Sequence, residues 1–210
     1  MYHRSLYFSI FHPQGSPYLC AINNKYKFTK MNTTEKTKWG LDATHSEISF
    51  KVKHLMISNV KGVFKAFNAD VYTSGDQFMT SEIELQINAS SIDTGVADRD
   101  VHLKSADFFD VENFPTIRFT GSKFEKEDDE NYILHGDLTI RGVTKPVKLD
   151  VEFGGVMKDP WGNQKVGFSV NGKINRKDFG LTWNAALETG GVLVSDDVKI
   201  SAEIQLVRQA

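Results

Sequence analysis

The sequence predicts an all-β protein, built as an antiparallel sandwich or barrel, and three observations predict it. From Trp39 onward, apolar residues recur at every second position, which is typical of strands with one buried face. Short polar or glycine-containing segments separate about eight or nine such stretches. Helix-compatible residues dominate only one segment, whereas a parallel sheet would alternate strands with helices. We favour the barrel because closure removes exposed strand edges.

The predicted strands follow one another along the chain. In the second, Ile48, Phe50 and Val52 alternate with charged and polar residues, and later strands repeat the pattern. A turn at Arg141 to Pro146 predicts a hairpin, and the acidic residues at 125–130 predict a solvated loop. The predicted strands cover residues 39–43, 47–53, 60–72, 82–88, 116–124, 134–140, 147–153, 166–174 and 198–206.

The exception is residues 95–109, where we expect a short helix that acts as a lid or plug at one barrel end. Arg99, Asp100 and His102 place a base, an acid and an imidazole close together in this segment. They could act as a catalytic group or form structural ion pairs, and the second interpretation is favoured because no nucleophile accompanies them.

Composition is that of an ordinary single domain. The 210 residues are 40% hydrophobic and 25% charged, enough for a core without disulfides or structural metals. The formal net charge of −2 disfavours nucleic acid as a partner. A single cysteine excludes an intramolecular disulfide and a multi-thiolate zinc site, and the histidines show no ligand spacing, so we expect no metal.

Residues 1–37 predict a disordered N-terminal extension, and residues 38–210 predict the barrel domain. The extension shows no sustained periodicity, and Met31 is an alternative start of the natural chain. Its apolar stretch at 6–11 is too short for a membrane span and lacks a signal cleavage site, so we expect a cytoplasmic protein, with the periplasm as the alternative.

A barrel of about eight strands is either filled by its own side chains or wide enough for one small ligand. Several inward positions are small, which leaves room for a ligand or marks bends in the strands. These positions are Gly62, Ala66, Gly121, Gly136, Gly172 and Ala202. No common catalytic motif occurs; residues 167–173 have phosphate-loop spacing but lie in a predicted strand and are followed by Ile174.

Six motifs, in order, resemble the YceI-like family over residues 38–207. They begin at Trp39, Ser91, Arg99, Phe114, Gly136 and Arg176, and read WGLDATHS, SIDTG, RDVHLKSADFFD, FPTIRF, GDLTIRGVTKP and RKDFG. The resemblance implies an extended lipocalin-like, antiparallel eight-stranded β-barrel with a short helix near one end. It also implies an apolar tunnel that binds a polyisoprenoid or similar lipid, with no catalysis and no required cofactor.

Strand parity and this resemblance together predict the tunnel lining: Ile48, Phe50, Val52, Phe64, Ile83, Leu85, Phe108, Phe109, Phe119, Leu134, Leu138, Phe168 and Val170. For the headgroup we name His54, Arg99 and His102. The expected ligand is a polyisoprenoid, an isoprenoid quinone or a fatty-acid-like lipid, held for storage, shielding or transport. Transient membrane contact and a homodimer are further expectations.

Two other functions stay open. One is an enzyme that acts on such a lipid through Arg99, Asp100 and His102. The other is a stress-related interaction protein whose barrel is filled by its own side chains.

Overall fold

The computed structural model describes residues 36–75, 77–186 and 192–209. The predictions for the N-terminal extension, including the alternative start at Met31, therefore lie outside the described residues except for its last two positions, which belong to the first strand.

The described chain is predominantly β. Its strands are β1 (Lys36–Leu41), β2 (Glu47–His54), β3 (Ser58–Phe64), β4 (Phe67–Ser74), β5 (Gln77–Asn88), β6 (Ile92–Asp93), β7 (Thr116–Lys126), β8 (Asn131–Ile140), β9 (Val143–Lys158), β10 (Gln164–Asn175) and β11 (Val194–Arg208). The helices are the 3-10 turns η1 (Ala89–Ser91) and η2 (Arg176–Phe179) and the α-helix α1 (Ala97–Lys104).

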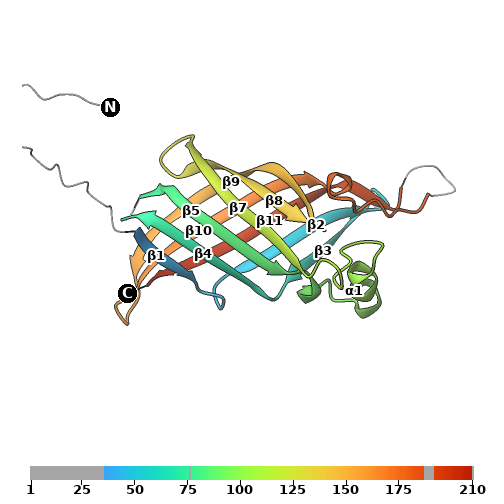
Figure 1. The fold of residues 1–210 in the computed structure, drawn as a ribbon, viewed down its shortest axis with the longest axis horizontal. Coiled ribbons are helices and arrows are strands. Elements are labelled where there is room, and N and C mark those ends of the chain that lie inside the picture. Colours follow the sequence, from blue (N-terminus) through green and yellow to red (C-terminus); the bar gives the residue numbers. More distant parts are fainter. Residues whose placement is uncertain (1–35, 76, 187–191, 210) are drawn as a thin grey trace, which may run out of the picture. The chain divides into compact units, whose positions relative to one another are not determined.

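Antiparallel pairing closes the sheet into a barrel of eight strands, as predicted: β1, β4, β5, β7, β8, β9, β10 and β11 (Figure 1). β1 closes the ring by pairing with the C-terminal end of β11, where Leu41 lies opposite Leu206. The rest of β11 pairs with β2, so β1 and β2 together occupy one position in the wall. β3 and β4 share the next position, because β3 pairs with β2 and β4 pairs with β1.

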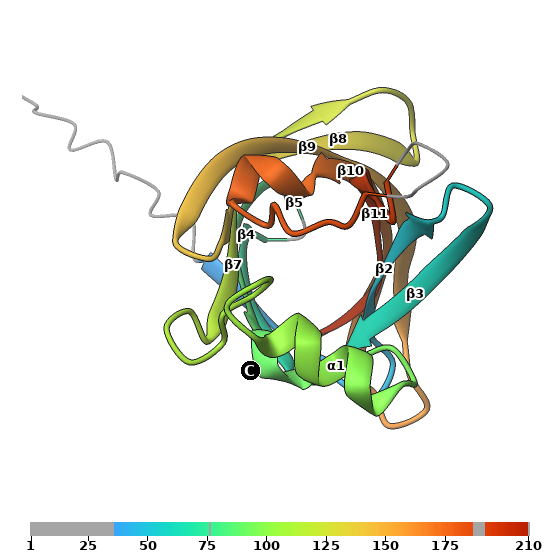
Figure 2. The same ribbon diagram turned by 90° about the vertical axis from the view of Figure 1, so that its right-hand side faces the viewer.

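α1 lies across one end of the barrel, beside β3 (Figure 2). It is shorter than the predicted 95–109 helix, because Ser105 adopts an extended backbone and residues 105–114 continue as turns. No helix among the described residues has the length and apolar character needed to cross a bilayer.

The predicted turn at Arg141 to Pro146 was too long. The hairpin turns on Arg141 and Gly142 alone, both with positive φ, as two-residue hairpin turns of type I′ require. Pro146 lies within β9, opposite Asp137. β9 pairs with β10 only from Leu149 onward, so the missing N–H of Pro146 removes no hydrogen bond on that side.

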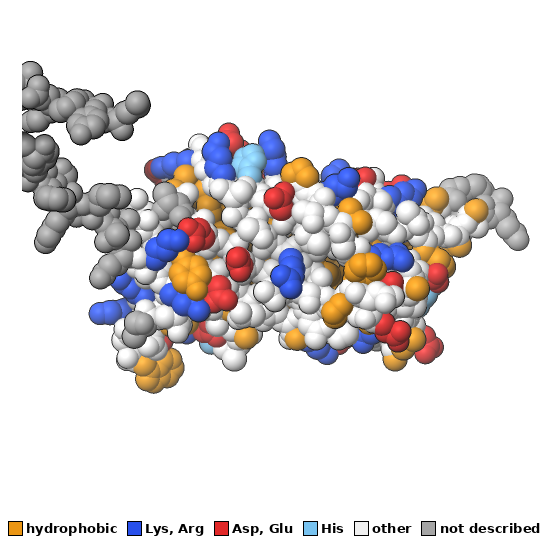
Figure 3. Space-filling view, in the orientation of Figure 1, with side chains coloured by type: hydrophobic (Ala, Val, Ile, Leu, Met, Phe, Trp, Pro, Cys, Tyr) orange, Lys and Arg blue, Asp and Glu red, His pale blue; other side chains and the backbone are white. Residues whose placement is uncertain are grey.

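The outer wall carries the polar half of each alternating strand. The stretch 60–72, predicted as one strand, is interrupted at residues 65–66, where β3 ends and β4 begins. Acidic and basic side chains are interspersed on the face shown in Figure 3. The apolar half points inward and forms the core.

Candidate functional site

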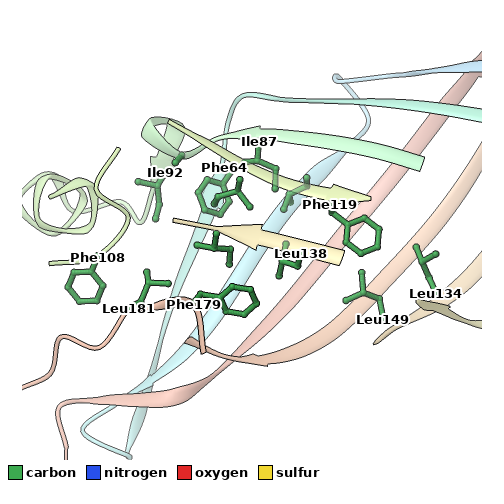
Figure 4. Packing of buried hydrophobic residues seen from close by; sticks show 14 of the residues in the cluster. Phe64, Ile87, Ile92, Phe108, Phe119, Leu134, Leu138, Leu149, Phe179 and Leu181 are labelled. Carbon is green, nitrogen blue, oxygen red and sulfur yellow. The ribbon is translucent and has the colours of Figure 1, made fainter. Parts of the chain in front are cut away.

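The barrel encloses an apolar cavity of about 260 Å³. All thirteen residues that the sequence predicted as lining surround it, and Figure 4 shows several of them, such as Phe119 and Leu138, pointing inward from neighbouring strands. Placement is what the structure establishes; the contact of these residues with a ligand stays a prediction.

Further residues line the cavity that the prediction left out. Most share the inward parity of predicted neighbours on the same strand and could have been found from it: Ile87, Ile117, Val147, Leu149, Val151, Ile174, Val198, Ile200, Ala202, Ile204 and Leu206. Phe78 and Arg176 lie outside such alternation; Arg176 opens the RKDFG motif, but nothing in the sequence linked either residue to the cavity.

Three polar residues of the described chain border the cavity, and the side chain of each hydrogen-bonds to the backbone; that of Ser49 does so on the outer face of β2. Ser49 Oγ donates to the carbonyl of Ser201 (3.2 Å), and Ser81 Oγ donates to that of Phe78 (2.5 Å). Arg176 donates to several carbonyls, described below. Water needs two to four polar partners to remain in a cavity, so this interior favours an apolar occupant.

Aromatic packing closes the end formed by β1 and β4. Trp39 is completely buried, and its indole N–H donates to Thr73 Oγ1 (3.0 Å). The ring of Phe78 lies 5.0 Å from that of Trp39, 6.0 Å from Phe153 and 5.4 Å from Phe168, measured between centroids. These four rings form a plug, so the cavity does not continue through this end.

A second aromatic group covers the α1 end. The imidazole of His102 packs edge-on against Phe108 (5.1 Å) and Trp183 (4.8 Å), and Phe108 lies 5.2 Å from Trp183. Phe109 makes an edge contact with Phe64 of β3 at 5.9 Å. Phe108 and Phe109 also line the cavity, so α1 and its following loop form the cover of this end.

None of the three predicted headgroup residues lines the cavity. Arg99 donates through Nε and Nη2 to the hydroxyl (2.7 Å) and carbonyl (2.9 Å) of Thr94. His102 Nε2 lies 2.9 Å from Asp107 Oδ2. His54 ends β2 opposite Val194, which is a lining residue.

Asp100 accepts from the N–H and the hydroxyl of Thr94, so Arg99 and Asp100 both hold this residue in place. Arg99 and Asp100, two members of the group that could have been catalytic, are therefore engaged in fixing the start of α1. The interpretation of Arg99 and Asp100 as structural agrees with these contacts, although they act through Thr94 and not by pairing with each other.

Arg176 is a buried clamp between η2 and β11. Its guanidinium donates to the carbonyls of Leu181 (2.6 Å), Trp183 (2.7 Å), Ser195 (2.9 Å) and Val194 (3.4 Å). Burial lowers the pKa of Arg176 from its ordinary value, and the nearby Asp196 opposes that effect. The clamp holds Leu181 and Trp183 over the α1 end of the cavity.

The inward glycines do not add to the cavity. A Cβ on Gly62 would lie 2.5 Å from the ring of Phe50, and one on Gly136 would lie 2.4 Å from the ring of Phe119. A Cβ on Gly172 would lie 2.5 Å from Leu149. Large neighbouring side chains thus occupy the space that these glycines leave, and the cavity lies beyond them.

Asp42 fixes the break between β1 and β2. Its carboxylate accepts from the N–H and hydroxyl of Thr44, from Lys165 Nζ (2.9 Å) and from Gln205 Nε2 (3.0 Å), and His45 Nδ1 lies 3.1 Å away. These hydrogen bonds, with that of Thr44 the strongest influence, hold the pKa of Asp42 far below its usual range. Asp42 thereby connects β1 to β10 and β11.

Comparison with known proteins gives matches that span the barrel. The family model described as YceI-like domain matches residues 39–206. A UPF0312 protein from Staphylococcus epidermidis is 46% identical over 172 residues, covering 80% of this chain and 96% of that protein.

Solved structures agree with the barrel. The YceI protein of Campylobacter jejuni is 37% identical, with a TM-score of 0.63 over 81% of this chain and 97% of that one. A domain from Saccharophagus degradans, described as polyisoprenoid binding, matches with a TM-score of 0.61 at 16% identity over 81% of this chain and 98% of that one, which shows a shared fold. The family match, the relatives and the barrel agree, and the chain belongs to the YceI-like family.

Proposed function

We propose that this protein binds one amphiphilic lipid with its apolar chain in the barrel cavity, for storage, shielding or transport. The observation that carries the proposal is the cavity itself, about 260 Å³ enclosed by aliphatic and aromatic side chains with every polar lining group bonded to the backbone. The polyisoprenoid binding described for the Saccharophagus degradans domain supports a lipid at the level of the family.

Physical chemistry favours a slender chain. Each Å² of apolar surface removed from water contributes roughly 25 cal/mol, and a preformed cavity avoids reorganising the protein for each ligand. The volume lies slightly below the range of about 300 to 1,000 Å³ that is usual for ligand pockets. A single unbranched or methyl-branched chain, as in a polyisoprenoid, an isoprenoid quinone or a fatty acid, fits such a space better than a bulky ring system.

The polar end of the ligand is proposed to lie at the α1 end, because aromatic rings plug the opposite one. His54 and His102 belong to this end, and Arg99 stands at the start of the same helix. They remain the proposed headgroup contacts. His102 has a side chain that is 40% exposed, so a headgroup can reach it from outside the cavity.

Ala202 offers a direct test. It lines the cavity from the middle of β11, opposite Ile48 on β2 and Val170 on β10. A long isoprenoid chain or a fatty acid cannot pass a phenyl ring placed there, so Ala202→Phe should lower the lipid retained per protein at least ten-fold. The measurement is mass spectrometry of lipid extracted from the purified protein.

Ser201→Phe is the matched control, because Ser201 precedes Ala202 on the same strand and faces outward toward Asn171. This variant should retain lipid as the original protein does. Equal retention by Ala202→Phe and the original protein would show that the cavity is not where the lipid binds.

A further inference from the structure

The turn between β2 and β3 is built from residues that a hairpin turn does not favour. Leu55 and Met56 have positive φ values of 52° and 59°. Glycine and asparagine adopt this conformation readily, whereas bulky side chains are strained in it. The sequence therefore keeps apolar side chains here at a cost to folding, and such local strain points to a functional site.

These side chains are also exposed. Leu55, Met56 and Ile57, which we call the apolar tip, have 36%, 58% and 84% of their surface accessible. The apolar tip lies at the same end of the barrel as α1, on a different part of the rim (Figures 1 and 2). α1 carries a separate exposed apolar residue, Val101, with 69% of its surface accessible. Contiguous exposed apolar residues mark interaction sites more often than scattered ones do.

A second unfavourable arrangement lies on the outer wall of the same strands. Lys173 is opposite Lys199, Lys199 is opposite Lys51, and Lys51 is opposite Lys61, so four lysines form one row across β10, β11, β2 and β3. All four are exposed. Like charges directly opposite each other destabilise a sheet.

Few counter-charges reach this lysine row. Lys173 pairs with Asp197 at 3.1 Å, and within the described part of the chain no carboxylate lies within 4 Å of the ammonium groups of Lys51, Lys61 or Lys199. Glu47, Asp93 and Asp150 line the same shallow groove, together with Lys148. Asp93 is already paired with Lys65. The groove therefore keeps an excess of positive charge.

The spacing of the two features suits a bilayer surface. A strand rises about 3.3 Å per residue, so Lys53 stands about 3 Å and Lys51 about 10 Å behind His54, where β2 ends and the turn with the apolar tip begins. Apolar side chains of interfacial proteins enter about 5 to 10 Å below the headgroups. With the apolar tip at that depth, Lys53 meets the phosphates, and Lys51 of the lysine row lies within about one Debye length of them.

We infer that the apolar tip and the lysine row together form a docking surface for a membrane that carries anionic lipids. A polyanion or an acidic protein would bind to the lysines alone and would leave Leu55, Met56 and Ile57 exposed to water. A bilayer accounts for both features. Docking by this face brings the α1 end of the barrel to the membrane, where a lipid could be taken up or released.

Vesicle co-sedimentation of the full chain tests the inference. The probes are vesicles of phosphatidylcholine alone and vesicles with about one third phosphatidylglycerol. Binding should be confined to the anionic vesicles and should weaken as salt screens the charges. Equal binding to both kinds of vesicle, or binding to neither, would overturn the inference.

Two variants separate docking from folding. Leu55→Asn with Met56→Gly removes two of the three side chains of the apolar tip and introduces the residues that a positive φ favours, so stability should not fall while vesicle binding drops at least ten-fold. Replacing Lys51, Lys61 and Lys199 by Gln relieves like-charge repulsion and should weaken binding about 100-fold, at roughly five-fold for each lysine near an anionic surface.

Control variants show whether a loss of vesicle binding is specific to the docking surface. Replacing Lys123, Lys126 and Lys158 by Gln changes the net charge equally at places away from the α1 end and should alter binding less than three-fold. Ala202→Phe should bind vesicles normally, so failure of lipid retention and failure of docking can be told apart. The lysine variant could lose vesicle binding while the tip variant keeps it, and the original protein could bind heparin as tightly as anionic vesicles. That pair of results would assign the lysine row to a polyanion and overturn the membrane proposal.

Discussion

Removal of the bound lipid should destabilise the barrel by an amount that the cavity volume limits. Empty apolar cavities cost about 24 cal/mol for each Å³, so 260 Å³ corresponds to about 6 kcal/mol. This is comparable to the whole free energy of unfolding of many domains, about 5 to 15 kcal/mol. An unoccupied barrel would therefore be close to the limit of stability.

The expected shift is large enough to measure simply. For a domain of this size, 1 kcal/mol changes Tm by about 2 to 4 °C, so complete filling would raise Tm by about 12 to 24 °C. The assay is differential scanning calorimetry of the protein before and after extraction of lipid, and again after reloading with a long-chain isoprenoid alcohol.

Ala202→Phe provides the control, because its cavity is blocked at mid-strand. Its Tm should be insensitive to extraction and reloading, whereas that of Ser201→Phe should respond fully. Coincident melting of the extracted and reloaded original protein would refute the reasoning, since it would mean that the lipid fills no interior space.

Other predictions concern the groups that hold the ends of the barrel. Asp42→Asn should lower the free energy of unfolding by about 2 kcal/mol at pH 7, because it removes a charged acceptor of several hydrogen bonds. The folded-state pKa of Asp42 is depressed, so its contribution to stability is fully present above the unfolded value of 3.8 and is lost as the pH falls below it. Urea unfolding should therefore show a smaller difference in stability between Asp42→Asn and the original protein at pH 3 than at pH 7, and a constant difference would contradict this account. Arg176→Lys should cost about 2 to 4 kcal/mol in urea unfolding, because one ammonium cannot bond to four carbonyls and each one left unpaired is destabilising. Arg141→Lys, at a half-buried arginine with one carbonyl contact, is the control, and an equal effect of both would argue against the clamp. Trp39→Ala should cost about 3 to 5 kcal/mol and shift the retained lipid to longer chains by opening the plug, while Trp161→Ala, at a site 83% exposed, should change neither.

Strand alternation predicted both the barrel and its lining, for one physical reason. A strand has a period of two, so a run such as Ile48, Phe50 and Val52 must point to one side, and the apolar side of a closed sheet is its interior. The same rule would have added Ile87 and Val151. Side-chain identity and parity were sufficient because no contact between distant segments had to be known.

Features that depend on such contacts could not be predicted. Arg176 is one arginine among charged residues in the sequence, and only the fold brings four carbonyls around it. Asp42 likewise finds Lys165 and Gln205 more than a hundred positions away. Trp39, Asp42 and Arg176 all belong to the family motifs. Trp39 is part of the aromatic plug, Asp42 connects β1 to β10 and β11, and Arg176 holds Leu181 and Trp183 in place.

The headgroup prediction relied on residues that lie close together in the sequence, and the structure does not place them in the cavity. Arg99 and His102 were named because charged and aromatic groups lie close together in the sequence, but their hydrogen bonds go to Thr94 and Asp107 in the same segment. Local proximity in sequence favours local contacts, and it does not indicate which groups face a cavity. Their role toward a headgroup remains a proposal.

Native mass spectrometry of the freshly purified protein, followed by extraction and identification of what is released, tests the central claim most directly. The account predicts one isoprenoid or acyl lipid per chain, lost in Ala202→Phe and kept in Ser201→Phe. A bare protein mass that persists after incubation with isoprenoids, quinones and fatty acids would contradict it.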